Sequence, residues 1–170
     1  ATSYDRGSDD MVDTRVLAIE KKGMEAADKV VTVSDLTRNI VINKYGIDPA
    51  KVVTVHNAVD FSGRSKMEVE RGVKDKIVTF LGRITFQKGP EYFIEAAAKV
   101  LKRTRNVRFV MAGSGDMMNK AIRQVARLGI SDRFHFTGFL RGQEVQKMFA
   151  LSDVYIMPSV SEPFGISPLE

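Results

Sequence analysis

The strongest constraint on the fold is an alternation of short apolar runs with helical patterns between residues 77 and 157. Four runs rich in β-branched and aromatic residues, 77–81, 107–112, 134–136 and 154–157, are bounded by polar residues, Gly or Pro, as buried strands are. The segments between them repeat apolar residues at helical spacing. Helical crossovers between successive strands favour a parallel sheet with helices on both faces, so we predict an α/β, Rossmann-like domain.

The first third of the chain is less regular. We predict an amphipathic helix whose apolar stripe is interrupted at Gly23, then strands at 30–33 and 52–55, with a helix capped by Ser34 between them. Residues 62–76 are charged and lack apolar periodicity, which indicates a connector. The chain stops just after a strand and its loop, where another crossover helix should begin, so we expect a piece of a longer protein.

Residue counts exclude several kinds of chemistry. The 170 residues include no cysteine and two histidines, His56 and His135, so disulfides, thiolate zinc sites and cysteine nucleophiles are ruled out. We assign neither histidine a catalytic role, because no partner for one is evident. The net charge of +5 fits an anionic partner without identifying it. Because no apolar run approaches about 18 residues and no signal-peptide core is present, we expect a cytoplasmic protein without a transmembrane segment.

A first candidate site lies at residues 82–89, between a predicted strand and the helix that Pro90 opens. In open α/β sheets ligands bind beyond the carboxyl ends of the strands, where helix N-termini attract anions. Arg83 offers a planar fork and Lys88 a mobile point charge, a pair suited to a diphosphate. The spacing is not that of a Walker A loop. A βα turn with two solvated cations fits the spacing equally well.

A second candidate site follows the strand predicted at 154–157. Glu162 and Glu170 bracket a loop in which Gly165 permits close backbone approach to a ligand. A carboxylate is also a good acceptor for a pair of sugar hydroxyls. Taken alone, this segment is better described as an exposed acidic loop with a capping glutamate.

A third segment, residues 113–118, follows a strand and opens a helix, as a dinucleotide fingerprint does. Met118 stands where that fingerprint has its third glycine, and the match is weak even when complete. We therefore interpret the segment as a tight turn with Asp116 as a possible helix cap.

The order of these segments resembles the donor-binding domain of retaining GT-B glycosyltransferases, of the glycogen-synthase and sucrose-synthase type. Residues 27–34 and 56–60 are similar to the end of the acceptor-side domain and the hinge of that family, and residues 4–8 and 20–25 are similar to its glycogen-synthase-like members. The resemblance implies an end of the acceptor-side domain at 1–60 and an incomplete nucleotide-sugar-binding domain at 61–170. The motifs of the second domain are 80–83, 87–89, 112–115, 136–139, 153–154, 158–159 and 162–170.

Family membership implies a role for each matching position. Arg83 and Lys88, next to Gly82, would bind the diphosphate of a nucleotide sugar and steady the leaving group. Glu162 would contact the donor sugar, and the loop with Arg141 lies where the family holds the base. The resemblance implies catalytic roles for Arg83, Lys88 and Glu162 and no metal or cofactor. The backbone of Phe164, Gly165 and Ile166 would approach the donor closely. Glu170 would accept hydrogen bonds from the ribose hydroxyls.

The resemblance also implies which substrates the complete protein uses and that this piece alone is a poor catalyst. We expect a nucleotide sugar such as UDP-glucose or ADP-glucose as donor, a glycan or small-molecule acceptor, and no efficient transfer by this piece alone. A sugar-nucleotide epimerase or a phosphorylase on the same fold remains an alternative. A basic nucleic-acid-binding module is a further alternative, although lysines and arginines are interleaved with acids and form no single stripe.

Overall fold

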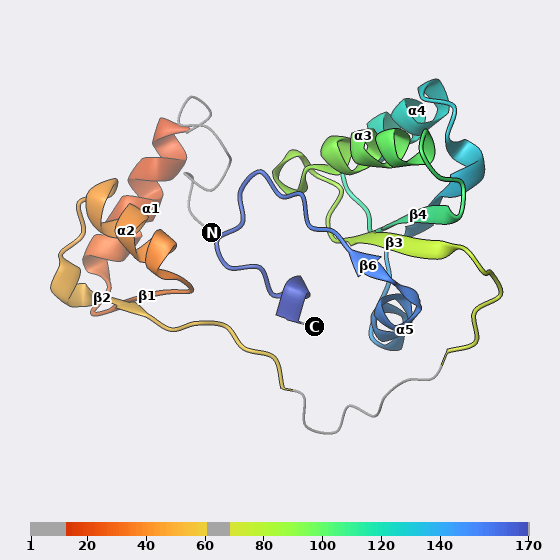
Figure 1. The fold of residues 1–170 in the computed structure, drawn as a ribbon. Coiled ribbons are helices and arrows are strands. Elements are labelled where there is room, and N and C mark those ends of the chain that lie inside the picture. Colours follow the sequence, from red (N-terminus) through yellow and green to blue (C-terminus); the bar gives the residue numbers. More distant parts are fainter. Residues whose placement is uncertain (1–12, 61–68, 170) are drawn as a thin grey trace. The chain divides into compact units, whose positions relative to one another are not determined.

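The computed structural model describes residues 13–60 and 69–169, which form two compact units (Figure 1). Unit 1 takes in the described residues of Ala1–Asp60 and Val160–Glu170, and unit 2 those of Phe61–Ser159. The described end of the chain thus groups with the residues before the connector. Residues 4–8, which carry part of the family resemblance, and Glu170 lie outside the described residues.

Unit 2 is built on a parallel sheet of four strands in the order β5–β4–β3–β6. The chain adds β4 and β5 on one side of β3 and then returns to place β6 on the other side (Figure 1). The strand order therefore reverses between β3 and β6, the kind of switch point outside which open α/β sheets bind ligands. The strands are β3 (Lys76–Leu81), β4 (Val107–Ala112), β5 (Phe134–Gly138) and β6 (Val154–Tyr155).

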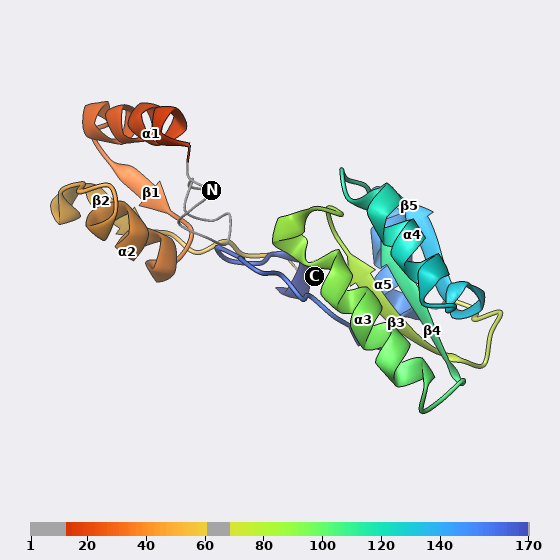
Figure 2. The same ribbon diagram turned by 90° about the horizontal axis from the view of Figure 1, so that it is seen from above.

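Helices cover both faces of this sheet (Figures 1 and 2). Helices α3 (Pro90–Leu101) and α4 (Met118–Arg127) pack on one face, and α5 (Gln143–Leu151) packs on the other. Each face has its own apolar cluster, one including Val125 of α4 and the other Met148 of α5. The prediction of an α/β fold with a parallel sheet and helices on both faces is confirmed.

Phenylalanines form the centre of the larger core. The ring centroid of Phe93 in α3 lies 5.6 Å from that of Phe80 in β3 and 5.8 Å from those of Phe109 in β4 and Phe134 in β5. Burying each ring contributes about 1.5–3 kcal/mol. These contacts fix α3 over three strands, and so fix its N-terminus at their carboxyl edge.

Unit 1 pairs two short parallel strands, β1 (Val30–Thr32) and β2 (Val52–Thr54). Helices α1 (Thr14–Ala26) and α2 (Asp35–Asn43) supply the other elements of this unit, with its core at Val41, Tyr45, Ile47 and Val52. As predicted, Ser34 caps α2, since its hydroxyl accepts a hydrogen bond of 3.1 Å from the Thr37 N–H.

The helix predicted in the first third of the chain is present as α1. It continues through Gly23, whose carbonyl accepts a hydrogen bond of 3.2 Å from the Ala27 N–H. One local prediction is wrong. Asp116 does not cap α4, since Met117 is the capping residue and no side chain caps the helix. The Met117 N–H instead donates to the carbonyl of Ile84, which satisfies one of the free donors at the helix start.

Candidate functional site

The loop 82–89 connects β3 to α3 at the switch point of the unit 2 sheet. Ile84 anchors it, because its side chain is fully buried in the phenylalanine-rich core. The preceding residue, Arg83, is exposed. Lys88 is the last residue of a short 3₁₀ turn, η4 (Phe86–Lys88). The loop therefore holds both predicted cations on a backbone whose position the core determines.

Backbone contacts with the neighbouring loop fix the position of Gly82 and Ile84. The Gly82 N–H donates to the Ala112 carbonyl and the Ile84 N–H to the Ser114 carbonyl, both at 2.9 Å. A Cβ atom on Gly113 would overlap the carbonyl oxygen of Gly82. Close packing of two loops explains the glycine there, which favours the tight-turn interpretation over a dinucleotide fingerprint.

The start of α3 faces the segment that follows β6. Gly89 caps the helix in the left-handed conformation, with φ 64°, and Pro90 occupies the first turn as predicted. The carbonyl of Pro158 lies directly against Gly89. The two loops of the switch point therefore meet backbone to backbone, and the N-terminus of the 12-residue helix α3 lies at the carboxyl edge of the sheet.

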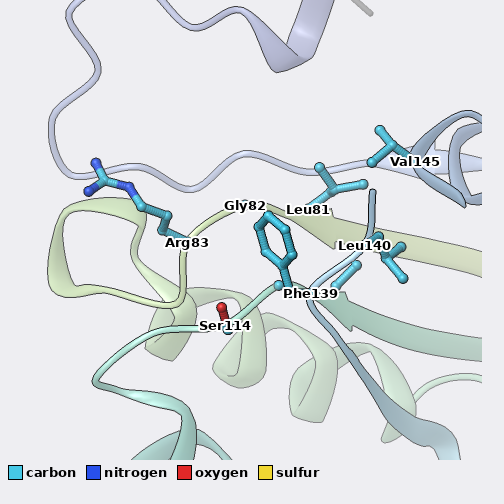
Figure 3. A pocket seen from close by; sticks show the side chains of 9 residues that line it. Leu81, Gly82, Arg83, Ser114, Phe139, Leu140 and Val145 are labelled. Atoms are coloured by element: carbon cyan, nitrogen blue, oxygen red, sulfur yellow. The ribbon is translucent and has the colours of Figure 1, made fainter. Parts of the chain in front are cut away.

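A pocket of about 190 Å³ opens at the same edge (Figure 3). Gly82 and Arg83 are the predicted site residues that line it. The Phe139 ring lies close to Gly82, and the Arg83 side chain extends away from the apolar side chains (Figure 3). The remaining lining residues come from the ends of β3 and β4, from the segment after β5 and from α5: Leu81, Ala112, Gly113, Ser114, Phe139, Leu140 and Val145.

Most of this lining was not predicted as part of a site. Leu81, Ala112 and Val145 belong to apolar patterns that indicate a core, and apolar periodicity does not distinguish a core side chain from one that lines a pocket. Their position at the ends of strands and near the start of a helix is the feature that could have indicated a ligand site.

Arg141 lies beside the pocket but not among the residues that line it. Its guanidinium carbon is 5.4 Å from the centroid of the Phe139 ring, a cation–π distance, and its backbone N–H donates to the Glu144 carboxylate at 3.0 Å. Phe139 itself is 63% exposed. An aromatic face that is held in place but accessible can stack on a flat ligand.

The second predicted loop belongs to unit 1. The Phe164 ring stacks on His56 with centroids 5.8 Å apart, which gives His56 a structural contact within that unit. Gly165 has φ 79°, a conformation that favours glycine, and Ile166 is 45% exposed. Glu162 is half-buried in the same segment. The structure brings Arg83 and Lys88 together on one loop and Glu162, Phe164, Gly165 and Ile166 on the other.

Asp153, at the opposite edge of the unit 2 sheet from the pocket, has a strongly perturbed ionisation. A hydrogen bond from the Ile77 N–H, with the Lys76 and Arg71 side chains, lowers the pKa of Asp153 to about 2, although partial burial opposes this. The carboxylate links Arg71 of the connector to the start of β3 and does not line the pocket.

Two further observations concern the described residues as a whole. No group of three His, Cys, Asp or Glu side chains that could hold a metal ion is found within 13–60 and 69–169. Over the same residues, no helix has both the length and the apolar character needed to cross a bilayer.

An open parallel sheet with a pocket outside its carboxyl ends, beside a switch point, defines a ligand-binding α/β domain of the Rossmann type. Comparison with known proteins narrows this class. The family described as "Glycosyl transferases group 1" matches residues 63–170, and "Glycosyltransferase Family 4" matches residues 2–62. The chain belongs to the group 1 glycosyl transferases, and its fold is that of GT-B enzymes.

Individual relatives agree with this assignment. An uncharacterised glycosyltransferase of Methanocaldococcus jannaschii is 37% identical over 153 residues, which cover 84% of this chain and 39% of the relative. The 2-deoxystreptamine glucosyltransferase of Streptomyces kanamyceticus is 30% identical over 165 residues, 91% of this chain and 43% of the relative. This chain thus spans about two fifths of the length of these curated relatives.

Solved structures show the same fold. Anabaena HepE in complex with UDP and glucose superposes with a TM-score of 0.79 at 20% identity, over 93% of this chain and 46% of HepE. A mutant of S. aureus TarM, solved in complex with fondaparinux, alpha-GlcNAc-glycerol and UDP, superposes with a TM-score of 0.77 at 19% identity, over 94% of this chain and 31% of TarM.

Proposed function

We propose that this chain binds the nucleotide-sugar donor of a retaining hexosyltransferase that acts on a glycan or other small-molecule acceptor. The observation that carries the proposal is the pocket at the carboxyl edge of β3 and β4, with Arg83 in its lining and the N-terminus of α3 at the same edge. A mostly apolar pocket next to a cation and a helix N-terminus suits a ligand that is flat at one end and anionic at the other.

In this proposal the base occupies the pocket and the diphosphate lies at the loop 82–89. Phe139 supplies a face for the base, and Arg141 holds the ring through the cation–π contact. The Arg83 guanidinium, outside the apolar part of the pocket, binds the phosphates together with Lys88, and the positive end of the α3 dipole favours their charge.

The loop 162–170 is proposed to bind the sugar end of the same donor in the complete protein. Glu162 accepts hydrogen bonds from the donor sugar, and Glu170 accepts them from the ribose hydroxyls. Gly165, with its positive φ, lets the backbone of the adjacent Phe164 and Ile166 approach the ligand closely.

The chemistry assigned to these residues is stabilisation of charge. As the bond from the sugar to the diphosphate breaks, positive charge develops on the sugar and negative charge on the leaving diphosphate. Arg83, Lys88 and the helix N-terminus stabilise the leaving group, and Glu162 orients the sugar. We propose that these cations and the helix dipole act without a divalent metal.

The identity of the donor is proposed from the chemistry of the neighbours. HepE and TarM were solved with UDP, so UDP-glucose is the first donor to test, with ADP-glucose as the second. We further propose the glycogen-synthase and sucrose-synthase type within the family, on the order of motifs around Arg83, Lys88 and Glu162.

A calorimetric titration of the chain with UDP-glucose, ADP-glucose and GDP-mannose tests the proposal. We expect one of the three to bind, and expect Arg83→Ala and Lys88→Ala each to weaken binding. Loss of both charge-assisted contacts should cost on the order of 2–5 kcal/mol. Lys147→Ala is the matched control, because Lys147 is an exposed cation on α5 that does not line the pocket.

Other outcomes would favour other functions. Unchanged affinity in both Arg83→Ala and Lys88→Ala would remove the diphosphate assignment. Conversion of the donor sugar without any acceptor would indicate an epimerase. Tight oligonucleotide binding that weakens steeply as salt rises would indicate a nucleic-acid-binding module, whereas a single nucleotide-sugar site responds much less to salt.

A further inference from the structure

We propose that the outer surface of helices α3 and α4 binds the surface of a bilayer that contains anionic lipids. This inference goes beyond donor binding and does not depend on it. It concerns one cluster of exposed cations, called here the α3–α4 basic surface: Lys99, Lys102, Arg103, Lys120, Arg123 and Arg127.

The positive charge of the chain is concentrated in this part of the sequence. Residues 90–133 contain nine Lys and Arg against four Asp and Glu, a net charge of +5 that equals the net charge of the whole chain. The remaining residues are therefore neutral in sum. Two of the nine cations, Arg108 and Arg133, form ion pairs of 2.8 Å with Asp75, and most of the others lie on α3, on α4 or at the ends of these helices.

Helix geometry directs the cations of α4 away from the core. Lys120, Arg123 and Arg127 follow one another at three- and four-residue spacing and so share a face of the helix. Ala121 and Val125, on the opposite side, are 2% and 3% exposed and pack in the core. All three cations are exposed.

The C-terminal end of α3 adds three more cations. Lys99, Lys102 and Arg103 are exposed at the last turn of that helix and just after it. The turns at this end of the two helices lie next to each other, since Arg105 forms an ion pair of 3.6 Å with Asp132. Helices α3 and α4, which carry these cations, thus lie side by side (Figure 2).

Most of these charges are not neutralised by the protein. Lys120 pairs with Glu91 at 2.8 Å, but over the described residues no ion pair is formed by Lys102, Arg103, Arg123 or Arg127. Favourable interaction with the helix dipole explains a cation in the last turn, such as Arg127, but not Arg123 in the middle of α4.

Exposed apolar side chains in the same layer favour a lipid surface over a nucleic acid. Tyr92 and Val100 of α3 are 55% and 38% exposed, and Ile122 and Leu128 in and after α4 are 46% and 43% exposed. A helix layer that exposes cations together with aliphatic and aromatic side chains is typical of helices that lie in the bilayer interface, where the apolar groups enter the headgroup region.

Sedimentation of the 170-residue chain with vesicles tests this inference. The vesicles are pure phosphatidylcholine or about three parts phosphatidylcholine to one part phosphatidylglycerol. We expect binding to the anionic vesicles only. Reversing two charges in Arg123→Glu/Arg127→Glu should weaken it by at least about thirty-fold, the equivalent of about 2 kcal/mol, because each basic side chain near an anionic surface contributes about 1 kcal/mol.

Lys22→Glu/Lys147→Glu is the matched control. It changes the net charge of the protein by the same amount as the test variant, but its two residues lie on α1 and α5, outside the α3–α4 basic surface. Lys102→Glu/Arg103→Glu is a second test of the surface, should the α4 variant fail to fold by circular dichroism. Ile122→Ser should weaken binding without changing the charge.

Three results would overturn the inference. The first is no binding to anionic vesicles. The second is an equal loss in the control variant, which would show that only net charge matters. The third is tighter binding to an oligonucleotide than to vesicles with the same dependence on Arg123 and Arg127, which would assign the surface to nucleic acid.

Discussion

The carbonyl oxygen of Pro158 occupies the space that a Cβ atom on Gly89 would need. Gly89 also has φ 64°, so a side chain there meets both a strained backbone and a neighbouring chain segment. Because Gly89 caps α3 and Pro158 follows β6, this contact sets how closely the two loops of the switch point approach each other.

Gly89→Ala should therefore destabilise the protein by more than the backbone alone accounts for. An alanine in the left-handed conformation costs about 1 kcal/mol, and overpacking against the Pro158 carbonyl adds about 1–3 kcal/mol. Urea denaturation measures the sum. Gly129→Ala is the matched control, because Gly129 has φ 66° and nothing within 4 Å of its added Cβ, so only the backbone cost applies. Equal losses in the two variants would contradict the close approach at Pro158.

Gly115→Ala tests the contact between the two loops beside the pocket. Its Cβ would overlap the Ile84 carbonyl, which accepts a hydrogen bond of 3.0 Å from the Met117 N–H. We expect a loss of about 2 kcal/mol in urea denaturation and weaker nucleotide binding, because the loop that carries Arg83 must shift. Gly72→Ala should be nearly neutral, since its Cβ has nothing within 4 Å. Unchanged binding in Gly115→Ala would show that the position of Arg83 does not depend on this contact.

Local patterns were enough to predict most of the elements. Strand β4 has the predicted bounds Val107–Ala112, because an apolar run between polar turns leaves few alternatives. Helix α1 was predicted although Gly23 interrupts its apolar stripe, and the helix continues through this position because a glycine inside a helix costs only about 1 kcal/mol. Strand β6 ends at Tyr155, two residues before the apolar run does, because pairing with β3 decides its length.

The candidate site was only partly predictable. Arg83 was predicted because it lies between a strand and the helix that Pro90 opens, where open α/β sheets bind ligands, and it lines the pocket. The reason for Gly113 was not accessible, because it depends on the carbonyl of Gly82, thirty-one residues earlier, lying against it. Val145 was interpreted as a core residue of a helix. That it lines the pocket depends on how the strands and α5 are arranged in space, which the local pattern does not give.

Asp153 makes the stability of the protein sensitive to acid. Because its pKa in the folded state is lowered to about 2 from an ordinary value of 3.8, the folded state binds this proton less readily than the unfolded state. The carboxylate therefore stabilises the fold fully above about pH 4, and this contribution is lost as the pH falls toward 2.

Asp153→Asn should lower the urea midpoint at pH 7, and the difference from the unmodified protein should shrink as the pH falls from about 4 to about 2. Asp116→Asn is the control, because Asp116 is exposed and forms no ion pair with a described residue. A difference that stays constant across this range would show that the Asp153 carboxylate does not act through its ionisation.

Phe139→Ala separates binding from stability at the pocket. Phe139 is 63% exposed, so truncating it removes little buried area and should change the free energy of unfolding by less than about 0.5 kcal/mol. If the ring stacks on the base, the same change should weaken nucleotide binding by about 1–3 kcal/mol, a loss of about 5-fold to 150-fold by calorimetry. Tyr92→Ala removes a comparably exposed ring on α3 that does not line the pocket, and should leave affinity unchanged. Equal affinities in all three proteins would place the base away from Phe139, and the pocket would then need another occupant.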